Sequence, residues 1–141
     1  MKKTLSTLLI LTVSLFAEIN GYQNYRNLYN DMSDGKLTKP VLLMVGSTTC
    51  KFCKKELSKM NSDKTFSDFI NNNMEFIYVN QDKDFLPIDY YAEMTPAFFI
   101  LSPRTLKPIN SKPAYGAIDI YSLQDWLYKI VLKYRAYKEG Y

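Results

Sequence analysis

The chain has 141 residues, of which 47% are hydrophobic and 15% aromatic, and its formal net charge is +4. This length and composition are typical of one domain with a hydrophobic core, and the charge is too weak to indicate nucleic-acid binding. The chain contains two cysteines and no histidine. These counts exclude a disulfide-rich scaffold, Ser-His-Asp and Cys-His catalysis, and histidine-ligated metals.

The first 17 residues have the pattern of a secretory signal peptide. A basic start at Met1-Lys2-Lys3 is followed by an apolar stretch over 5–16, and Ala17 precedes a polar segment. The apolar stretch is shorter than the ~20 residues that span a bilayer, so a permanent membrane anchor is the weaker alternative. We therefore expect residues 1–17 to be a signal peptide and residues 18–141 to form the exported domain.

Aromatic residues at helical spacing predict a helix between the signal peptide and Pro40. Tyr22, Tyr25, Tyr29 and Met32 recur at this spacing, and the polar segment 34–36 ends the pattern. A tyrosine stripe could also bind a carbohydrate or another ligand. We favour an amphipathic helix whose apolar face covers a sheet.

The two cysteines lie where a predicted strand leads into a predicted helix. The apolar run 41–45 indicates a buried strand, whereas Cys53, Leu57 and Met60 recur at helical spacing. This places Cys50 at the backbone N–H groups of the first helical turn and Cys53 one turn further, on the buried face. Those N–H groups and the helix dipole stabilise a thiolate, so we expect Cys50 to be the nucleophile and Cys53 to close a disulfide onto it.

The rest of the chain alternates between helical and extended patterns. Proline cannot donate a hydrogen bond inside a sheet, so we expect Pro96, at the start of an apolar run, to occupy either the first position of a strand or a special turn. Ser122 and Asp125 predict a capping box at the start of the last helix. The predicted elements are a short helix around 66–70, a strand over 74–80, a loop over 81–94 with at most a short helix near 88–92, a strand over 97–101, an extended piece near 107–109, and a final helix with the stripe Leu123, Leu127, Ile130, Tyr134 and Tyr137.

This order of elements, together with Cys50-x-x-Cys53 and Thr95-Pro96, resembles the thioredoxin superfamily over essentially the whole exported domain. The resemblance implies an α/β, thioredoxin-like fold over residues 18–141, with a central mixed sheet of about four to five strands flanked by helices. It also implies a cis peptide bond before Pro96, which then faces the disulfide, and substrate contacts from the backbone of Thr95. Gly116 matches the glycine that lets substrate approach the groove.

The segment around the cysteines departs from thioredoxin itself. Thr49 replaces the tryptophan before the first cysteine, and Lys51 and Phe52 replace the intervening Gly-Pro, so we expect these two to shape the site. Met44 stands where thioredoxin has a buried aspartate that helps protons reach the second cysteine. The proton of Cys53 must therefore pass to water or to a carboxylate that the sequence does not identify.

Small exported thioredoxin-like proteins of bacteria are a closer match, because a Lys-Pro-apolar strand like residues 39–42 follows their first helix. The resemblance implies a monomeric periplasmic thiol–disulfide oxidoreductase that needs no cofactor or metal. It would reduce protein disulfides with electrons from a membrane thiol transporter. The chain has no room for the helical insertion of periplasmic disulfide oxidases or the dimerisation domain of periplasmic isomerases, which favours a reductase over an oxidase. A third alternative is a peptide-binding or assembly module with an inert disulfide.

Simpler roles for the same residues are alternatives to redox chemistry. A zinc site needs four ligands, so the cysteine pair would need a second chain to complete one. A purely structural disulfide is also a weak alternative, because a bridge between residues so close in sequence constrains the chain little. Lys54, Lys55 and Lys59 fit the solvated face of a helix, whereas Lys51 fits that role and a role beside the sulfur equally well.

Overall fold

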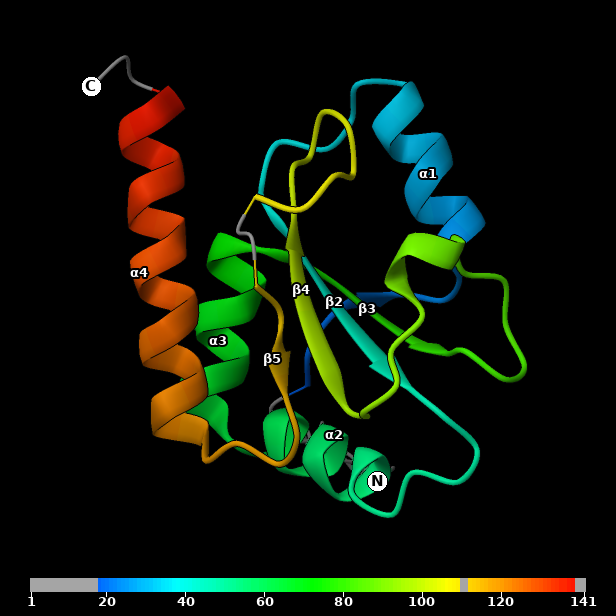
Figure 1. The fold of residues 1–141 in the computed structure, drawn as a ribbon. Coiled ribbons are helices and arrows are strands. Elements are labelled where there is room, and N and C mark those ends of the chain that lie inside the picture. Colours follow the sequence, from blue (N-terminus) through cyan, green and yellow to red (C-terminus); the bar gives the residue numbers. More distant parts are fainter. Residues whose placement is uncertain (1–17, 110–111, 139–141) are drawn as a thin grey trace, which may run out of the picture.

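A computed structural model describes residues 18–109 and 112–138, so the predicted signal peptide lies outside the described residues. In that part of the chain, no helix is both long and apolar enough to cross a membrane. The elements, shown in Figure 1, are β1 (Gly21–Tyr22), α1 (Tyr25–Ser33), β2 (Val41–Gly46), α2 (Cys53–Ser62), α3 (Lys64–Asn73), β3 (Glu75–Asn80), the 3-10 helix η1 (Ile88–Tyr90), β4 (Ala97–Leu101), β5 (Ala114–Tyr115) and α4 (Ile120–Lys138).

The strands form one mixed sheet in the order β1-β3-β2-β4-β5. β1 and β2 pair with β3 in parallel, whereas β4 is antiparallel to β2 and β5 is antiparallel to β4. α3 and α4 cover one face of the sheet, and α1 lies on the other (Figure 1). The predicted mixed sheet flanked by helices is confirmed.

β2 is the central strand, and it is buried on both faces. Its alternate side chains enter two separate cores. Leu42 and Met44 pack among residues of α2, α3 and α4, whereas Leu43 and Val45 pack under α1 and η1. This double burial explains why the strand reads as a continuous apolar run rather than an alternating one.

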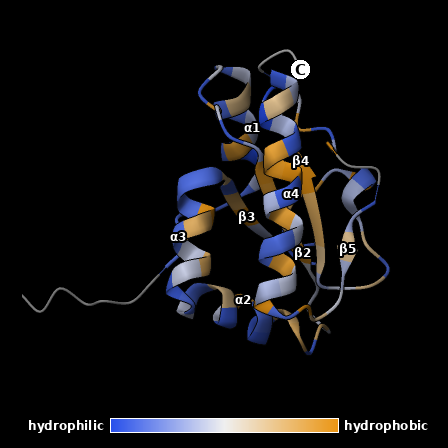
Figure 2. Cartoon of the chain, turned by 90° about the vertical axis from the view of Figure 1, so that its left-hand side faces the viewer, coloured by the Kyte–Doolittle hydropathy of each residue, from blue (hydrophilic) through white to orange (hydrophobic). Residues whose placement is uncertain are grey.

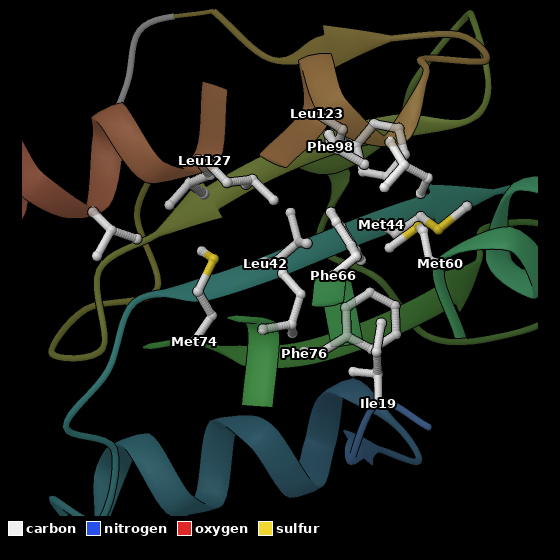
Figure 3. Close-up of a cluster of buried hydrophobic side chains, with 14 residues drawn as sticks. Ile19, Leu42, Met44, Met60, Phe66, Met74, Phe76, Phe98, Leu123 and Leu127 are labelled. Carbon is white, nitrogen blue, oxygen red and sulfur yellow. The ribbon is translucent and has the colours of Figure 1, made fainter. Parts of the chain in front are cut away.

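The core under α3 and α4 is the larger of the two and is built mainly from aliphatic and aromatic side chains. Figure 3 shows Leu42 of β2 pointing toward Phe66 of α3, with Met44 and Met60 next to each other. Figure 2 shows β4 in the hydrophobic colour along its length, whereas α3 and α4 carry both colours. The helices therefore cover the sheet with one face each and present the other to solvent.

α4 confirms most of its predicted stripe but begins with a different cap. Leu123 and Leu127 are buried, whereas Tyr137, which was assigned to the stripe, is 82% exposed. The predicted capping box is wrong, because the Ser122 backbone N–H donates to the Asp119 carboxylate at 3.0 Å. Hydrogen bonds from the side chain and backbone of Ser122 also lower the pKa of Asp119. Ser122 thus lies inside the helix, and Asp119 is the cap.

α1 is shorter than its tyrosine pattern suggested. Asn24 caps the helix by accepting a hydrogen bond from the Asn27 backbone at 2.9 Å, so Tyr22 lies outside the helix in β1. Tyr25 and Leu28 form the buried face, whereas Tyr29 is 52% exposed. The amphipathic helix is confirmed, but its buried face is not the predicted tyrosine stripe.

Two pieces of chain complete the β4 edge of the sheet. The extended piece near 107–109 pairs with the end of β4 through an isolated bridge between Leu101 and Pro108. β5, which the sequence did not predict as a strand, pairs with the beginning of β4, where Ala97 faces Tyr115. With only two residues, β5 is too short to show the alternation of apolar and polar residues from which a strand can be predicted.

Two leucines of α4 provide a matched test of this packing. Leu127 is fully buried, whereas Leu132 is 43% exposed. Leu127→Ala should lower the free energy of unfolding by about 2–5 kcal/mol, because it removes apolar contacts and leaves a cavity. Leu132→Ala should cost less than about 1 kcal/mol. Urea denaturation followed by circular dichroism measures both, and equal losses would contradict this orientation of α4.

Candidate active site

The two cysteines are joined by a disulfide in the loop between β2 and α2. The Cα atoms of Cys50 and Cys53 are 5.5 Å apart. α2 begins at Cys53, so the prediction that Cys50 lies in its first turn is wrong. The Cys50 N–H instead donates to the Ser47 carbonyl at 3.2 Å, and the turn this creates delays the helix until the Glu56 N–H reaches the Phe52 carbonyl at 2.8 Å.

Cys50 still lies at the positive end of α2, because the disulfide holds it against the first residue of the helix. Phe52 occupies the N-cap position and provides no side-chain hydrogen bond to the first turn. The N–H groups at this end are therefore not capped by a side chain and can stabilise negative charge on a nearby sulfur.

The two sulfurs differ in their access to solvent. Cys53 is 1% exposed and belongs to the buried face of α2, whereas Cys50 is only half-buried. An incoming disulfide can reach Cys50 more easily than Cys53. The buried position of Cys53 suits a thiol that reacts only inside the protein.

Three loops meet beside the disulfide. The hydroxyl oxygens of Ser47 and Thr95 are 3.2 Å apart, and the Thr48 N–H donates to the Asp82 carboxylate at 2.7 Å. These contacts hold the turn before Cys50 against the loops that precede η1 and β4. The structure therefore brings Thr95 next to the cysteine loop, as the resemblance implies.

Pro96 and Gly116 form the adjoining part of the site. The Thr95–Pro96 peptide bond is cis, and Pro96 is buried. The Gly116 N–H donates to the Pro96 carbonyl at 2.8 Å, which ties the loop after β5 to the beginning of β4. Gly116 has φ +85°, a conformation that glycine adopts at little cost.

Gly46, at the end of β2, is a site-shaping residue that the sequence analysis missed. A Cβ atom at this position would lie 2.3 Å from the Tyr78 hydroxyl and 2.8 Å from its ring. Burial raises the pKa of Tyr78, and the charge of Asp84 adds to the effect, so the phenol is neutral at physiological pH. A glycine is required here because Tyr78 crosses directly over the strand end.

Exposed apolar side chains flank the three segments that meet at the disulfide. Phe52 lies between the cysteines and is 54% exposed, while Met94, directly before Thr95, is 61% exposed. Tyr115, directly before Gly116, is 47% exposed, and Lys51 is also exposed. Exposed apolar side chains such as Phe52, Met94 and Tyr115 can contact an apolar segment of a partner protein.

Glu56 is the second residue that the sequence analysis missed. It is 1% exposed and lies one turn after Cys53 on the same face of α2. Its Oε2 is 3.1 Å from the Lys59 ammonium, whereas its Oε1 is buried and has no hydrogen-bond partner among the described residues. The signal was present in the sequence, because Glu56 falls on the stripe of Cys53 and Met60, but the sequence analysis did not single this residue out.

Met44 confirms that the strand supplies no acid to the site. It is fully buried and packs next to Met60 of α2 (Figure 3). Glu56 lies one turn before Met60 on the same helix. The buried carboxyl group near the second cysteine therefore comes from α2 rather than from β2. Among residues 18–109 and 112–138, no cluster of side chains could hold a metal ion.

The different exposures of the sulfurs predict different reactivities. After reduction, Cys50 should be alkylated first. The variant Cys53→Ser should accumulate mixed disulfides with partner proteins, because Cys50 can attack but nothing resolves the product. Cys50→Ser should accumulate none. Mass spectrometry of the alkylated and trapped species tests this assignment, which fails if Cys53 is the first to be modified.

Comparisons with known proteins identify the fold. No protein-family model matches the chain, and no curated protein matches it by sequence. Among solved structures, a thioredoxin from Thermus thermophilus is 19% identical with a TM-score of 0.66, and the match covers 87% of this chain and 95% of that one.

Two further structures extend this likeness. The germline-specific thioredoxin Deadhead of Drosophila melanogaster is 19% identical with a TM-score of 0.57, covering 79% of this chain and 98% of that one. A structure described as DsbH oxidoreductase is 13% identical with a TM-score of 0.56, covering 82% and 86%. The chain therefore has the thioredoxin-like fold, and its Cys50–Cys53 pair forms a disulfide between β2 and α2.

Proposed function

We propose that the protein is a thiol–disulfide oxidoreductase that reduces disulfides of other proteins. The observation that carries the proposal is the Cys50–Cys53 disulfide at the N-terminus of α2, with one sulfur accessible and the other buried. Thr95, Pro96 and Gly116 adjoin it, and exposed apolar side chains flank these segments. The thioredoxin-like fold supports the proposal, since two of the similar structures are thioredoxins.

The reaction proceeds in two exchanges, starting from the reduced protein. The Cys50 thiolate attacks one sulfur of the partner's disulfide, which releases the other partner sulfur as a thiolate and leaves Cys50 joined to the partner. Cys53 then loses its proton and attacks the Cys50 sulfur. The bond between Cys50 and the partner breaks, so the partner leaves with two electrons more and the Cys50–Cys53 bond forms.

In this mechanism Glu56 receives the proton of Cys53. The sequence left two acceptors open, water or an unidentified carboxylate, and Cys53 is too buried for easy access by water. Glu56 lies on the adjacent turn, and one of its carboxylate oxygens has no hydrogen-bond partner in the described part of the chain. A general base within reach of a thiol speeds its attack, so Glu56 fills the role that Met44 cannot.

Export and electron supply are parts of the same proposal. Residues 1–17 have the sequence of a signal peptide and direct the protein to the periplasm. A reductase in that compartment has to be reduced again after each turnover, so its electrons come from a membrane thiol transporter. The protein works as a monomer, with protein disulfides as its substrates.

A peptide-binding module is the second candidate, and one pocket favours it. A pocket of about 350 Å³ lies between α1 and the loop before η1, and it is lined by Tyr25, Arg26, Tyr29, Phe85 and Pro87. It lies with the core on the α1 face of the sheet, whereas α2 packs into the core on the opposite face. An aromatic pocket of this kind could hold an apolar segment without any redox chemistry.

The two functions predict different behaviour with a generic disulfide protein. A reductase should accelerate reduction of its substrate by dithiothreitol several-fold, because Cys50 captures the substrate and Cys53 releases it. The variant with both Cys50→Ser and Cys53→Ser should have no such effect. Turbidity of a substrate whose reduced chains precipitate follows the reaction, and an inactive wild-type protein would support the binding module.

The direction of electron flow predicts a reduction potential. Whatever stabilises the Cys50 thiolate makes the disulfide a stronger oxidant, and here the N-terminal end of α2 and the adjacent Lys51 provide that stabilisation. This moderate stabilisation should give a potential closer to about −270 mV, as in thioredoxin, than to about −120 mV, as in the strongest oxidant. The measurement is an equilibrium titration against glutathione.

Lys51→Ala serves as the control for that titration. Loss of its positive charge should move the potential to a more reducing value, because the reduced form loses a stabilising cation. A wild-type potential above about −150 mV would make the protein an oxidase and reverse the proposed direction.

A further inference from the structure

A row of exposed apolar side chains joins the active site to the pocket between α1 and the loop before η1, here called the α1 pocket. The row stands at every third position of the segment 85–94, ends directly before Thr95, and consists of Phe85, Ile88, Tyr91 and Met94. Each of these side chains is at least half exposed. Leu86 and Tyr90 of the same segment are buried in the core under α1. Core packing therefore explains the inward side of the segment but not its exposed side, and clustered exposed apolar residues commonly mark an interaction site.

The segment that carries this row is held in one shape by hydrogen bonds. The side-chain amide of Gln81 exchanges two hydrogen bonds with the backbone of Ala92, each 2.9 Å long. The Tyr90 hydroxyl donates to the Leu106 carbonyl. These contacts close the loop and anchor it in the core, so a partner would bind the exposed row without first having to order the loop.

The α1 pocket lies at the far end of the row and is lined mainly by aromatic rings. Phe85 contacts Tyr25 edge-on, with ring centroids 6.2 Å apart. The volume of about 350 Å³ is at the small end of ligand pockets, which measure about 300–1,000 Å³. The pocket therefore suits one large side chain, and its aromatic walls favour an aromatic occupant through edge-to-face contacts.

Arg26 gives the pocket a positive charge that no side chain of the described residues compensates. Its guanidinium group makes no hydrogen bond or ion pair within residues 18–109 and 112–138. The wall beside it is neutral, because burial raises the pKa of Tyr25 to about 12. A guanidinium group binds a carboxylate through two parallel hydrogen bonds and also stacks on aromatic rings. The lining therefore complements an aromatic side chain that lies beside a carboxylate.

A hydrogen bond ties the same loop to the cysteines. The Thr48 N–H donates to the Asp82 carboxylate at 2.7 Å. Cys50 is two positions after Thr48 and Phe85 is three positions after Asp82, so the Cα atoms of Cys50 and Phe85 are at most about 25 Å apart. About eight residues of extended chain span that distance. A substrate joined to Cys50 through its own cysteine can therefore reach the pocket with a nearby residue.

We propose that the α1 pocket is a second substrate site, which selects protein disulfides that have adjacent aromatic and acidic residues within about eight positions of the reacting cysteine. This inference rests on the proposed function. The aromatic side chain enters the pocket beside Tyr25 and Phe85, the carboxylate pairs with Arg26, and the exposed row contacts the chain between pocket and disulfide. Contact at two points raises the effective concentration of the substrate disulfide at Cys50. The pocket then serves disulfide exchange instead of replacing it.

Capture of synthetic peptides tests this selection. Each peptide is built from glycine and serine and carries one cysteine as its mixed disulfide with 5-thio-2-nitrobenzoate, with Phe-Glu placed four, six or eight residues away on either side. The reduced Cys53→Ser variant attacks the cysteine sulfur of the peptide through Cys50, and the coloured thiolate leaves. At one spacing or more, the Phe-Glu peptide should react about tenfold faster than a Ser-Ser peptide, because the pocket holds its anchor. It should also react faster than a Phe-Lys peptide.

Two matched pairs of variants in the Cys53→Ser background locate the effect. Phe85→Ser should remove the preference for Phe-Glu, whereas Tyr121→Ser, which removes an exposed aromatic ring from α4, should retain it. Arg26→Glu should reverse the preference between Phe-Glu and Phe-Lys. Lys133→Glu makes the same change of charge on α4, which covers the opposite face of the sheet from α1, and should leave that preference intact (Figure 1). Each rate is divided by that variant's rate with 5,5′-dithiobis(2-nitrobenzoic acid), which corrects for altered thiol reactivity.

The proposal is overturned if no Phe-Glu peptide reacts faster than the Ser-Ser peptide, or if the α4 variants lose the preference as fully as the pocket variants do. The peptide comparison leaves the pocket unaltered, so it decides the matter even where a pocket variant fails to fold. Failure of the proposed function gives a different result. Selective peptide capture by a protein that reduces no protein disulfide would refute the reductase and leave the pocket, whereas an active reductase without peptide preference would refute this inference alone.

Discussion

The double burial of β2 is the constraint on which the site depends. Leu42 and Met44 enter one core and Leu43 and Val45 the other, so the strand cannot shift its register by one residue without exchanging the two sets. That register fixes where the strand ends, at Gly46, and the cysteine loop begins at this point. Tyr78 closes over the same glycine from the neighbouring strand. The position of the disulfide is thus determined by packing far from the sulfurs.

The buried acid beside the second cysteine comes from an unexpected element. In thioredoxin, by resemblance, the strand supplies an aspartate, and this chain has Met44 at that position. Met44 packs against Met60 within a cluster of hydrophobic side chains (Figure 3). A buried carboxylate needs a cation or hydrogen bonds to compensate it, and Glu56 on the helix is 3.1 Å from the Lys59 ammonium. The acid and its cation therefore belong to the same element, whereas the strand contributes core packing and fixes where the cysteine loop begins.

Much of this architecture could be predicted from the sequence, and the misses have physical causes. The apolar run of β2, the proline before β4 and the cysteine spacing each report a strong local preference, so the sheet and the disulfide were predicted. The start of α2 was placed too early because the turn in which the Cys50 N–H donates to the Ser47 carbonyl does not change the spacing of hydrophobic residues along the sequence. Asp119 was missed as the helix cap because Ser122, three residues later, also has a side chain that can cap a helix, and Asp125 completes a capping-box pattern with it. Glu56 was missed because burial of a charge depends on a tertiary neighbour, here the core beneath α2, rather than on its own side chain.

The spacing of the chemical groups on α2 has a consequence for how such a site can change over time. Cys50, Cys53 and Glu56 stand at every third position of a single short segment, so the residues to which we assign the proposed electron and proton steps are encoded together. Cys53 and Glu56 are buried against the core, whereas Lys51 and Phe52 are exposed, so substitutions at these two exposed positions can alter the surroundings of the sulfurs without disturbing the sheet. Such a segment is modular: it could be transplanted into another thioredoxin-like scaffold as one cassette, with the loops that carry Thr95 and Gly116 left to select the partner.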